Sequence, residues 1–502
     1  MFDKILIANR GEIAIRVIRA CRELGIKAVA VYSEADRESL HVRYADECYC
    51  IGPARPAESY LDMDRIVDVA KTSGSEAIHP GYGFLAQIPD FAEKCKSNGI
   101  EFVGPPSDVL RIMGNKATAR RTMADAGVPV IPGSMRAVKD EREVAEVAEK
   151  VGYPALIKAV YGGGGKGMRL VKSKDEIKKA MELARLEAQT SFGSSDVYIE
   201  KLLTKPRHIE VQVLADKKGN VVHLGERECS IQRRYQKLIE ETPSPMMTKE
   251  LRKVMGKTAI DGAKAIEYHS AGTLEFLVDR KANFYFLEMN TRLQVEHIIT
   301  ELVTGVDLVK EQLRIAAGEK LRPEQDDIAM KGHALNCRIN AEDPYSDFVP
   351  CPGTIARYFV PGGPGVRVDS ALYAGYDIPI FYDPLVAKLA VWGGSRDEAI
   401  LRMKTALDEY VIEGIETTIP FHKKILDDEC FRRGEIHTDF LRERIGSLTV
   451  EAEFEGEEVA ALSAFLATYL SNRREGLAVI PQRRAESPSG WKMAGRRALM
   501  ES

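Results

Sequence analysis

The sequence predicts a multidomain protein of the α/β and α+β classes. Three observations lead to this prediction: a strand, helix, strand order at the N-terminus, a run of glycines between two strand patterns, and a later hairpin pattern that carries carboxylates. The chain has 502 residues, enough for about two to four domains, since a domain usually has about 100 to 200 residues. A large hydrophobic core is therefore available to position a buried site.

The first elements predict a parallel sheet. Residues 4–8 form a short apolar run, residues 13–24 carry apolar side chains at helical spacing, and residues 28–32 predict a second strand. Two strands joined by a helix pair in parallel. A further helix is predicted to begin at Ser59, because Asp62 completes a capping-box pattern. The first strand is not followed by GxGxxG, which disfavours a dinucleotide site of the usual kind.

A run of glycines suggests a phosphate site. Residues 153–171 predict a strand that carries Lys158, then four glycines over 162–165, then a second strand. Such dense glycines let backbone N–H groups approach phosphate oxygens and form a movable cover. The alternative is a surface hairpin without function. Lys158 favours the phosphate site, because an ammonium inside an apolar run needs an anionic partner.

This glycine run is not a Walker A loop. Lys166 is followed by Gly167 rather than by Ser or Thr, and the flanking segments have strand patterns. Upstream of the run, residues 114–129 have the pattern of a helix that Gly and Pro end. The sequence therefore predicts a nucleotide site of another architecture.

Residues 271–297 predict a β-hairpin that holds a divalent cation. Alternation with a period of two places side chains of each strand on one face, Thr273, Glu275 and Leu277 on the first and Phe284, Phe286, Glu288 and Asn290 on the second. If Glu275 lies opposite Glu288, residues 280–283 connect the strands and the carboxylates lie about 5 Å apart at Cβ. Mg²⁺ removes the repulsion of such a pair. The alternative, the solvent face of an edge hairpin, is weakened because both glutamates lie inside apolar runs.

Three polar residues spaced by two follow the hairpin: Arg292, Gln294 and Glu296. In an extended chain they point the same way, so the guanidinium can grip a planar anion such as bicarbonate while the carboxylate accepts a proton. A structural salt bridge between Glu296 and Arg292 is an alternative of equal weight. His297 is expected to take part in packing or hydrogen bonding.

Several separated blocks resemble one family. They are AIHPGYGFL at 77–85, MGNKATAR at 113–120, GGGGKGMRLV at 162–171, PRHIEVQVLAD at 206–216, ERECSIQRRYQK at 226–237, EMNTRLQVEH at 288–297 and CRINAEDP at 337–344. Through them the chain is similar to biotin carboxylase, of the ATP-grasp superfamily, up to about residue 446.

The resemblance implies an order of domains. A Rossmann-like parallel sheet is expected over 1–112, a central ATP-grasp domain with a glycine-rich lid at about 131–203 over 113–333, and a C-terminal mixed α+β domain over 334–446. Residues 447–502 lie outside the resemblance and predict an amphipathic helix followed by a basic end. This tail either docks on a partner subunit or is an unstructured, solvated end.

The resemblance also implies roles for individual residues. Contacts with ATP are implied for Lys116, Lys158, Gly163, Gly164, Gly165, Glu200, Lys201, Leu203, His208, Gln232, Leu277 and Leu287. Two Mg²⁺ or Mn²⁺ ions are implied at Glu275, Glu288 and Asn290. Bicarbonate is implied beside Lys237, Arg292, Gln294, Val295 and Glu296, and biotin beside Tyr82, Gly83 and Arg338.

The implied activity is the ATP-dependent carboxylation of biotin by bicarbonate. Glu296 would remove the bicarbonate proton, carboxyphosphate would form, and Arg338 would stabilise the biotin enolate, with Lys237 and Arg292 completing the catalytic group. For Arg338 the residues alone favour a pair with Glu342 or Asp343 instead. Alternative functions are those of another ATP-grasp ligase and of a noncatalytic, nucleotide-binding regulatory subunit.

Partners are expected on other chains. Lys331 and Lys492 each lack one flanking Met of the biotinylation signature, so biotin is expected on a separate carrier protein, with a carboxyltransferase subunit beside it and this chain as a homodimer. A separate chain with such a tail favours a two-subunit pyruvate carboxylase over an acetyl-CoA carboxylase. One departure stands out: Gln87 lies between Ala86 and Ile88 where family members carry Ser-Glu-Asn, so a carboxylate is lost and a neutral hydrogen bond is expected.

Composition excludes other classes of function. The net charge of -4, from 71 Lys and Arg against 75 Asp and Glu, gives no reason to expect nucleic acid. No window approaches about 18 consecutive apolar residues and no export signal is present, so we expect no membrane contact and a cytoplasmic location. The eight cysteines form no CxxC pair, which predicts reduced thiols and no zinc site.

Overall fold

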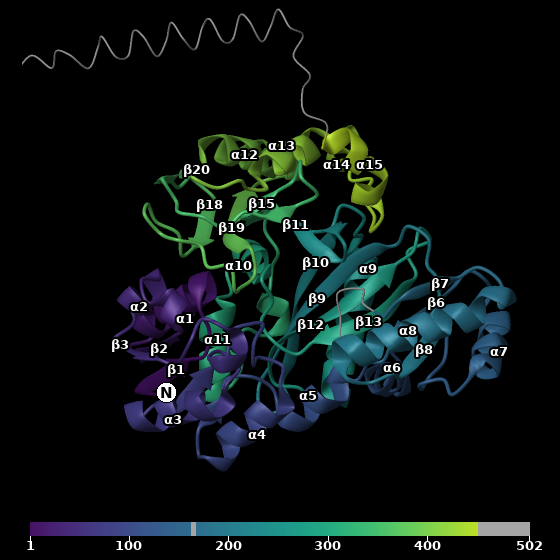
Figure 1. Ribbon diagram of the computed structural model, residues 1–502, viewed down its shortest axis with the longest axis horizontal. Helices are drawn as coiled ribbons and strands as arrows, with labels where there is room; N and C mark the ends of the chain where they lie inside the picture. The colour runs from purple at the N-terminus through teal and green to yellow at the C-terminus, as the bar shows by residue number, and fades with distance from the viewer. Residues whose placement is uncertain (162–166, 450–502) are drawn as a thin grey trace, which may run out of the picture. The chain divides into compact units, whose positions relative to one another are not determined.

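The computed structural model describes residues 1–161 and 167–449 (Figure 1). The predicted phosphate-covering glycines Gly163, Gly164 and Gly165 lie outside the described residues, and so do residues 450–502 with their predicted helix and basic end. All eight cysteines lie in the described part and are free thiols, as the sequence predicts. Within that part, no helix combines the length and the apolar character that crossing a membrane requires. The cytoplasmic location stays a prediction.

A five-stranded parallel sheet forms the N-terminal part, and this confirms the predicted strand, helix, strand order. The strands lie in the order β3, β2, β1, β4, β5, and every pairing is parallel. The strands are β1 (Lys4–Ile7), β2 (Lys27–Tyr32), β3 (Glu47–Cys50), β4 (Ala77–His79) and β5 (Glu101–Phe102). The accompanying helices are α1 (Gly11–Glu23), α2 (Leu40–Tyr44), α3 (Met63–Ser73), α4 (Pro89–Ser97) and α5 (Ser107–Gly114). β1 is apolar throughout its buried part because both faces of such a sheet are covered.

Two helices begin later than the sequence pattern predicts. The prediction that a helix begins at Ser59 is wrong: α3 begins at Met63, because Asp62 is itself the N-cap and accepts a backbone N–H of the first turn. The helix predicted from residue 114 is α6 (Lys116–Asp125), because the Asn115 side chain caps it in the same way. The second cap places a lysine in the first turn of α6.

A three-stranded antiparallel sheet contains the strands on either side of the glycine run. Its order is β7, β6, β8, with β6 (Ala155–Ala159), β7 (Arg169–Val171) and β8 (Val197–Lys201). Helices α7 (Glu141–Val151) and α8 (Ile177–Phe192) pack on this sheet at the right of Figure 1. Their shared core includes Val144, Ile157 and Met181. Lys158 lies on β6, as predicted.

An eight-stranded antiparallel sheet carries most of the predicted site. Its order is β13, β12, β9, β10, β11, β14, β19, β18. The strands are β9 (Arg207–Ala215), β10 (Val221–Arg233), β11 (Gln236–Thr242), β12 (Ser270–Val278), β13 (Phe284–Asn290), β14 (His333–Asn340), β18 (Val366–Ser370) and β19 (Leu385–Gly393). Helices α9 (Lys249–Ala265), α10 (His297–Thr304) and α11 (Leu308–Ala316) pack on it. β14 continues the sheet across the predicted domain boundary at residue 333, and the domain boundaries stay a prediction.

The predicted metal hairpin forms from β12 and β13. Glu275 pairs directly with Glu288, which confirms that the two carboxylates lie opposite each other. Phe276 then pairs with Phe286, so Leu287 is an extra residue that forms a bulge in β13. The bulge lies directly beside the carboxylate pair.

The bulge corrects two details of the prediction. Phe284 and Phe286 do not share a face with Glu288, because both pack against Phe276 in the core. The connection consists of residues 279–283 rather than 280–283, because the extra residue shifts the pairing by one. Strict alternation fails at a bulge, where two residues of one strand face one residue of the other.

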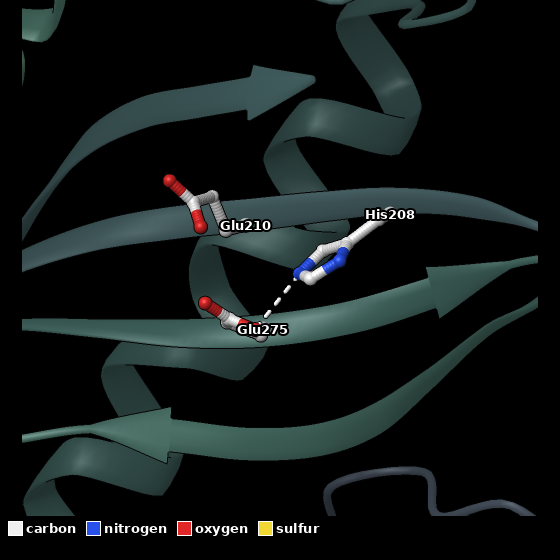
Figure 2. Close-up of side chains that lie close together, drawn as sticks. All are labelled: His208, Glu210 and Glu275. Carbon is white, nitrogen blue, oxygen red and sulfur yellow. Dashed lines mark ion pairs between the residues drawn. The ribbon is translucent and has the colours of Figure 1, made fainter. Parts of the chain in front are cut away.

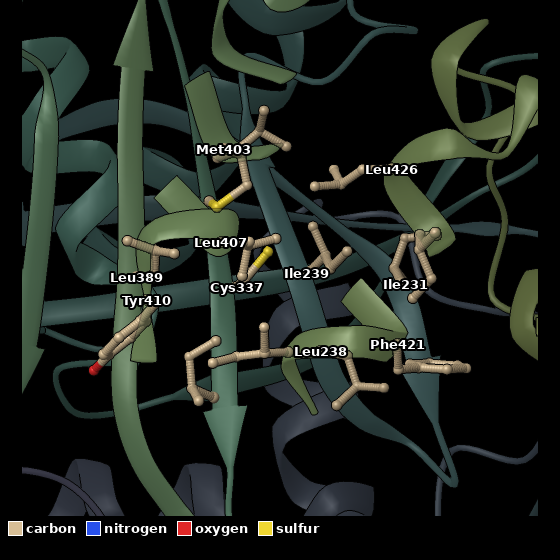
Figure 3. Close-up of a cluster of buried hydrophobic side chains, with 14 of the residues drawn as sticks. Ile231, Leu238, Ile239, Cys337, Leu389, Met403, Leu407, Tyr410, Phe421 and Leu426 are labelled. Carbon is tan, nitrogen blue, oxygen red and sulfur yellow. The ribbon is translucent and has the colours of Figure 1, made fainter. Parts of the chain in front are cut away.

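The C-terminal part is mixed α+β, as predicted. Its helices are α12 (Arg396–Glu409), α13 (Ile419–Asp427), α14 (Glu429–Arg432) and α15 (Phe440–Leu448). Two short antiparallel pairs join β15 (Glu342–Asp343) to β16 (Val349–Pro350) and β17 (Arg357–Phe359) to β20 (Val411–Glu413). In Figure 3, Cys337 and Leu389 of the large sheet share one hydrophobic core with Met403 and Leu407 of α12 and Phe421 of α13. This core holds β14 in place, and β14 carries Arg338.

Candidate active site

Charged side chains from neighbouring strands meet on the eight-stranded sheet. We call this set the central charge cluster; its members are Glu210 on β9, Arg227 on β10, Lys237 and Glu240 on β11, Glu275 on β12, Arg338 on β14 and Glu296 just before α10. Each of its carboxylates is at most 3% exposed. Buried charges at this density are stable only when each has a partner, so the contacts within the cluster decide what it can do.

Lys237 is the centre of the cluster. Its Nζ lies 2.5 Å from Glu210, 2.9 Å from Glu275 and 2.7 Å from Glu296. Burial lowers the pKa of the Lys237 ammonium, but the three carboxylates outweigh burial and raise its pKa well above the ordinary value. The ammonium is therefore a fixed positive charge on the predicted bicarbonate side.

Glu296 is held between two cations. Its Oε1 accepts from Lys237, and its Oε2 accepts from Arg338 Nη2 at 2.8 Å. Burial raises the pKa of the Glu296 carboxyl, but Lys237, Arg338 and Arg227 outweigh it and bring the pKa well below the ordinary value. Glu296 is thus ionised at neutral pH and able to accept a proton once a substrate takes over some of its cation contacts.

The two structural alternatives are not realised in the described residues. The ion pairs of Glu296 there are to Lys237 and Arg338, and none joins it to Arg292. Arg338 pairs with Glu240 at 2.6 Å and with Glu296, rather than with residue 342 or 343. The chain turns before α10 instead of staying extended, yet Glu296 still reaches the cluster.

Sequence reasoning does not single out three members of the cluster, Glu210, Arg227 and Glu240. Arg227 is fully buried, and its guanidinium donates to Glu210 at 2.5 Å. With Lys237 and Arg338 it makes three cations for the four carboxylates, and the imidazole of His208 lies 2.8 Å from Glu275. The signal that could have found Glu210 is the alternation of polar residues, His208, Glu210 and Gln212, in an otherwise apolar strand. No such signal in the sequence marks the other two members, Arg227 and Glu240.

The predicted metal ligands gather around Glu275. Its Oε1 accepts from Asn290 Nδ2 at 2.8 Å as well as from Lys237. Glu288, opposite, lies 3.2 Å from Lys116 Nζ, and its side chain is 34% exposed. Two facing carboxylates already surrounded by cations, one of them open to solvent, fit the oxygen ligands that Mg²⁺ or Mn²⁺ prefers.

A second set of potential metal-ligand atoms joins Glu275 to the neighbouring strand β9. His208, Glu210 and Glu275 bring one ligand atom each within 4.8 Å of one another, and Figure 2 shows them converging from β9 and β12. His208 Nε2 lies 2.8 Å from Glu275 Oε2. Burial lowers the pKa of the His208 imidazole, but Glu275 outweighs burial and raises it. Glu210 is fully buried and paired with both Arg227 and Lys237, whereas Glu288 is open to solvent, so we retain the predicted metal ligands.

Within the described residues, Arg292 donates its hydrogen bonds to neutral acceptors. Its Nε donates to Gln87 Oε1 at 2.7 Å, its Nη2 to Asn290 Oδ1 at 3.0 Å, and its Nη1 to the Leu293 carbonyl at 3.1 Å. The expected neutral hydrogen bond of Gln87 is therefore present. Gln294, the third polar residue of the segment, donates to Glu275 at 2.7 Å. The positive charge of Arg292 stays available for an anion.

The predicted nucleotide residues form two contacts. Lys158 Nζ lies 2.5 Å from Glu200 Oε1, so the anionic partner that the sequence predicted as a phosphate is a carboxylate in this structure. Gln232 Nε2 lies 2.7 Å from His208 Nδ1. Lys201 is exposed, and Leu203, Leu277 and Leu287 are half-buried. Val295, predicted beside bicarbonate, is half-buried as well.

The predicted biotin residues reach the same sheet through Lys388. Lys388 on β19 pairs in register with Arg338, so their side chains lie on one face. Its Nζ is 5.6 Å from the centroid of the Tyr82 ring. Gly83 is exposed and adopts a φ of 68°, a conformation that favours glycine.

Three family descriptions match consecutive parts of the chain. The biotin carboxylase N-terminal domain matches residues 1–110, the ATP-binding domain of the carbamoyl-phosphate synthase L chain matches 115–324, and the biotin carboxylase C-terminal domain matches 336–443. Together they span the part of the chain that contains the central charge cluster.

Relatives match over nearly all of their length. A pyruvate carboxylase subunit of Methanothermobacter thermautotrophicus is 56% identical over 94% of this chain and 100% of its own length. Biotin carboxylase 1 of Bacillus subtilis is 55% identical over 88% of this chain and 98% of its own. The crystal structure of the Hydrogenobacter thermophilus 2-oxoglutarate carboxylase biotin carboxylase domain dimer, with MgADP, ADP and bicarbonate, is 52% identical, covers 90% of this chain and 100% of that chain, and gives a TM-score of 0.87.

Proposed function

The chain belongs to the biotin carboxylase family, and from this premise we propose how its residues carry out ATP-dependent carboxylation of biotin with bicarbonate. The reaction is the first half-reaction of a biotin-dependent carboxylase, in which a ligase forms a C–N bond while ATP becomes ADP and phosphate. The observation that carries the proposal is the contact of Glu296 with both Lys237 and Arg338. It places a buried carboxylate base between two cations that suit an anionic substrate.

For the nucleotide we assign the residues that the family resemblance implies. They are Lys116, Lys158, Gly163 to Gly165, Glu200, Lys201, Leu203, His208, Gln232, Leu277 and Leu287. Glu275, Glu288 and Asn290 would hold Mg²⁺ or Mn²⁺. When bound, the metal offsets the negative charge of the phosphate oxygens. The lysines supply further positive charge to the same oxygens.

In the first step the chain positions and deprotonates bicarbonate. Arg292, whose charge is not used by a carboxylate, grips the anion together with Lys237. The substrate then takes over some of the contacts that Lys237 and Arg338 make with Glu296. Because these cations stabilise the ionised carboxylate less, the basicity of Glu296 rises. Glu296 takes the bicarbonate proton, a bicarbonate oxygen bonds to the γ-phosphorus, and the bond from that phosphorus to the bridging oxygen of ADP breaks. The products are carboxyphosphate and ADP.

In the second step the carboxyl group reaches biotin. Carboxyphosphate splits into CO₂ and phosphate, the phosphate takes the ureido N–H proton of biotin, and the biotin nitrogen bonds to the CO₂ carbon. Arg338 stabilises the enolate form of biotin, and Tyr82 and Gly83 face the ring. Because carboxyphosphate hydrolyses in water, the site must exclude water during this step.

The partners follow from the reaction. Biotin is carried by a separate protein, and a carboxyltransferase subunit uses the carboxylated product. The Hydrogenobacter structure is of a domain dimer, which supports a homodimer for this chain. The rival assignment to a different ATP-grasp ligase is not supported, since biotin carboxylase domains match both sides of the ATP-binding domain.

For the final acceptor we propose pyruvate, with this chain as the biotin carboxylase subunit of a two-subunit pyruvate carboxylase. The support is the identity of the match together with its length. A 2-oxoglutarate carboxylase small subunit of Hydrogenobacter thermophilus also covers 93% of this chain, but at 51% identity against 56% for the pyruvate carboxylase subunit. The pyruvate carboxylase subunit covers 94% of the 502 residues, more than the 449 residues that precede position 450, whereas the Bacillus biotin carboxylase covers 88%. The first alignment therefore includes part of the tail, which the sequence analysis left outside the resemblance. Purification with a tagged tail-deleted chain tests whether the tail holds the carboxyltransferase subunit.

The test of the activity is ATP cleavage by the purified chain. We expect cleavage that depends on bicarbonate and rises when free biotin is added. Stimulation by an amine or an amino acid in place of bicarbonate would instead support another ligase. ATP binding without turnover would support a regulatory subunit.

A further inference from the structure

A second, smaller group of buried charges lies on the three-stranded sheet. We call it the nucleotide charge cluster; its members are Lys158 on β6, Glu200 on β8 and Arg120 on α6. They are 7%, 3% and 5% exposed, respectively. Arg120 has no role in the function proposed above, so we asked what a buried guanidinium does there.

The fold brings the three side chains together through Tyr198. Lys158 lies directly opposite Tyr198 in the register of β6 and β8, and Glu200 follows two residues later on the same face. Tyr198 packs against Ala117 of α6. Arg120 lies one turn after Ala117, on the same side of the helix, and faces the charged row.

The cluster has more positive than negative charge. Glu200 Oε1 lies 2.5 Å from Lys158 Nζ, and Glu200 Oε2 lies 3.4 Å from Arg120 Nη1. Two buried cations thus share one carboxylate. The carboxylate of Glu288 has its own cation, Lys116, at 3.2 Å. Among the residues that the structure describes, the group therefore has one cation more than it has carboxylates, and a buried excess charge is costly unless a ligand supplies its partner.

Arg120 is also short of hydrogen-bond partners. Its Nε and Nη2 are buried and donate to no acceptor among the described residues. Burial lowers the pKa of the Arg120 guanidinium, and Glu200 opposes this effect. A buried arginine with two free donors is an expensive arrangement, and it persists only if another state of the site uses it.

We propose that Arg120 is a positioning residue that takes over Glu200 when ATP binds. This inference rests on the proposed function, in which Lys158 serves the phosphates and Glu200 serves the adenine. When Lys158 moves to the phosphates, Glu200 loses its closer cation. Arg120 then keeps the carboxylate ionised and oriented, so that it accepts the 6-amino hydrogen of adenine.

The same contact selects adenine over guanine. Guanine carries a 6-oxo group, an acceptor, and an ionised Glu200 repels it. If the carboxyl of Glu200 became protonated for lack of a cation, it would donate to that oxygen and the discrimination would weaken. Arg120 is therefore a specificity-determining residue that acts through Glu200.

The test compares Arg120→Met with Arg121→Met, because Arg121 is the exposed neighbour on the same helix. We expect Arg120→Met to raise the KM for ATP about tenfold, which is the cost of about 1.4 kcal/mol in binding, and to lower the preference for ATP over GTP by a similar factor. The kcat and the KM values for bicarbonate and biotin should stay within about twofold. Arg121→Met should resemble the wild type in every constant.

Two further variants show whether the effect passes through Glu200. In the background of Glu200→Gln, adding Arg120→Met should change the KM for ATP by less than about twofold, because coupled residues are not additive. If Arg120→Met does not fold, Arg120→Lys replaces it as the test variant, because it keeps the positive charge. Arg120→Lys should also raise the KM for ATP and leave kcat unchanged.

The outcomes separate this inference from the function itself. An inactive wild-type chain would refute the proposed function. An active wild type with an unchanged Arg120→Met, or with losses spread equally over kcat and all three KM values, would overturn the role of Arg120 alone. Full additivity with Glu200→Gln would overturn it as well.

Discussion

The central charge cluster and the nucleotide charge cluster solve the problem of buried charge in different ways. In the central cluster four carboxylates lie among Lys237, Arg227 and Arg338, and each carboxylate has at least one Lys or Arg nitrogen within 2.9 Å. In the nucleotide cluster Lys158 and Arg120 share the single carboxylate of Glu200. In the central cluster each carboxylate is paired before substrates bind, whereas in the described residues of the nucleotide cluster two cations share one carboxylate.

The difference indicates what each part of the reaction needs. A proton-accepting carboxylate must be in place before bicarbonate arrives, and a group of charges in which each carboxylate is already paired holds it there without reorganisation during the reaction. A phosphate-binding lysine must be free to leave its resting partner, and an unbalanced group favours the arrival of an anion. The predictions below use substitutions that treat the two clusters differently.

The largest effect is expected from Glu296→Gln in the central cluster. The amide cannot accept the bicarbonate proton, so biotin-dependent ATP cleavage should fall by about 10²- to 10⁴-fold. Nucleotide affinity, measured by calorimetry with ADP, should stay within about twofold, since Glu296 makes no contact with the nucleotide charge cluster. Equal losses of activity and affinity would argue against the assigned base.

Removing one lysine from each cluster should affect stability very differently. Lys237→Met leaves three buried carboxylates without a shared cation and should lower the free energy of unfolding by about 3 to 5 kcal/mol. Lys158→Met leaves Glu200 with Arg120 and should cost less than about 1 kcal/mol. Urea unfolding of both variants measures the difference. Similar losses would mean that the clusters are not distinguished by charge balance.

Gln87→Glu tests the free charge of Arg292. A carboxylate at position 87 would form an ion pair with the Arg292 Nε that now donates to an amide, so the KM for bicarbonate should rise about 3- to 10-fold with little change in the KM for ATP. Gln87→Leu removes the hydrogen bond without adding charge. If Gln87→Leu raises the KM for bicarbonate as much as Gln87→Glu, orientation rather than charge is what Gln87 provides.

A pH titration of stability should report buried histidines of the N-terminal and C-terminal parts, outside both clusters. Burial lowers the pKa of His41, His79 and His422 to about 4, against an ordinary value of 6.5. The unfolded chain binds these protons first, so their contribution is complete above pH 6.5 and is lost as the pH falls to about 4, by at most about 1.4 kcal/mol per pH unit for each histidine. His79→Gln should flatten this slope in urea unfolding. Glu296→Gln should leave the slope above about pH 5.5 unchanged, because the Glu296 carboxyl is ionised in the folded and the unfolded chain there; below that pH the unfolded carboxyl binds its proton first, so the variant should lose less stability than the wild type.

The parts of the fold with simple periodicity could be predicted from the sequence. The parallel N-terminal sheet and the strands around the glycine run follow from apolar runs and turn residues, and the pairing of Glu275 with Glu288 follows from alternation. The bulge at Leu287 could not be predicted, because one extra residue leaves no mark in the pattern of apolar and polar side chains.

The candidate site could be predicted only where its residues are close in sequence. Glu275, Glu288 and Glu296 lie within one short segment. Glu240 and Arg338, in contrast, are far apart in the sequence and pair only because β11 and β14 are neighbours in the sheet. Arg120 lies on a helix whose polar surface looks exposed, and only the packing of α6 shows that its guanidinium is buried. Long-range pairing of charges depends on topology, which a single sequence does not contain.

The most direct test of the account uses bicarbonate labelled with ¹⁸O. If Glu296 deprotonates bicarbonate and a bicarbonate oxygen bonds to the γ-phosphorus, each phosphate released in the presence of biotin should carry one labelled oxygen, in assays short enough to limit exchange with water. Phosphate that carries no label would contradict the account, because ATP would then be cleaved by water and not by the substrate that the central charge cluster is built to hold.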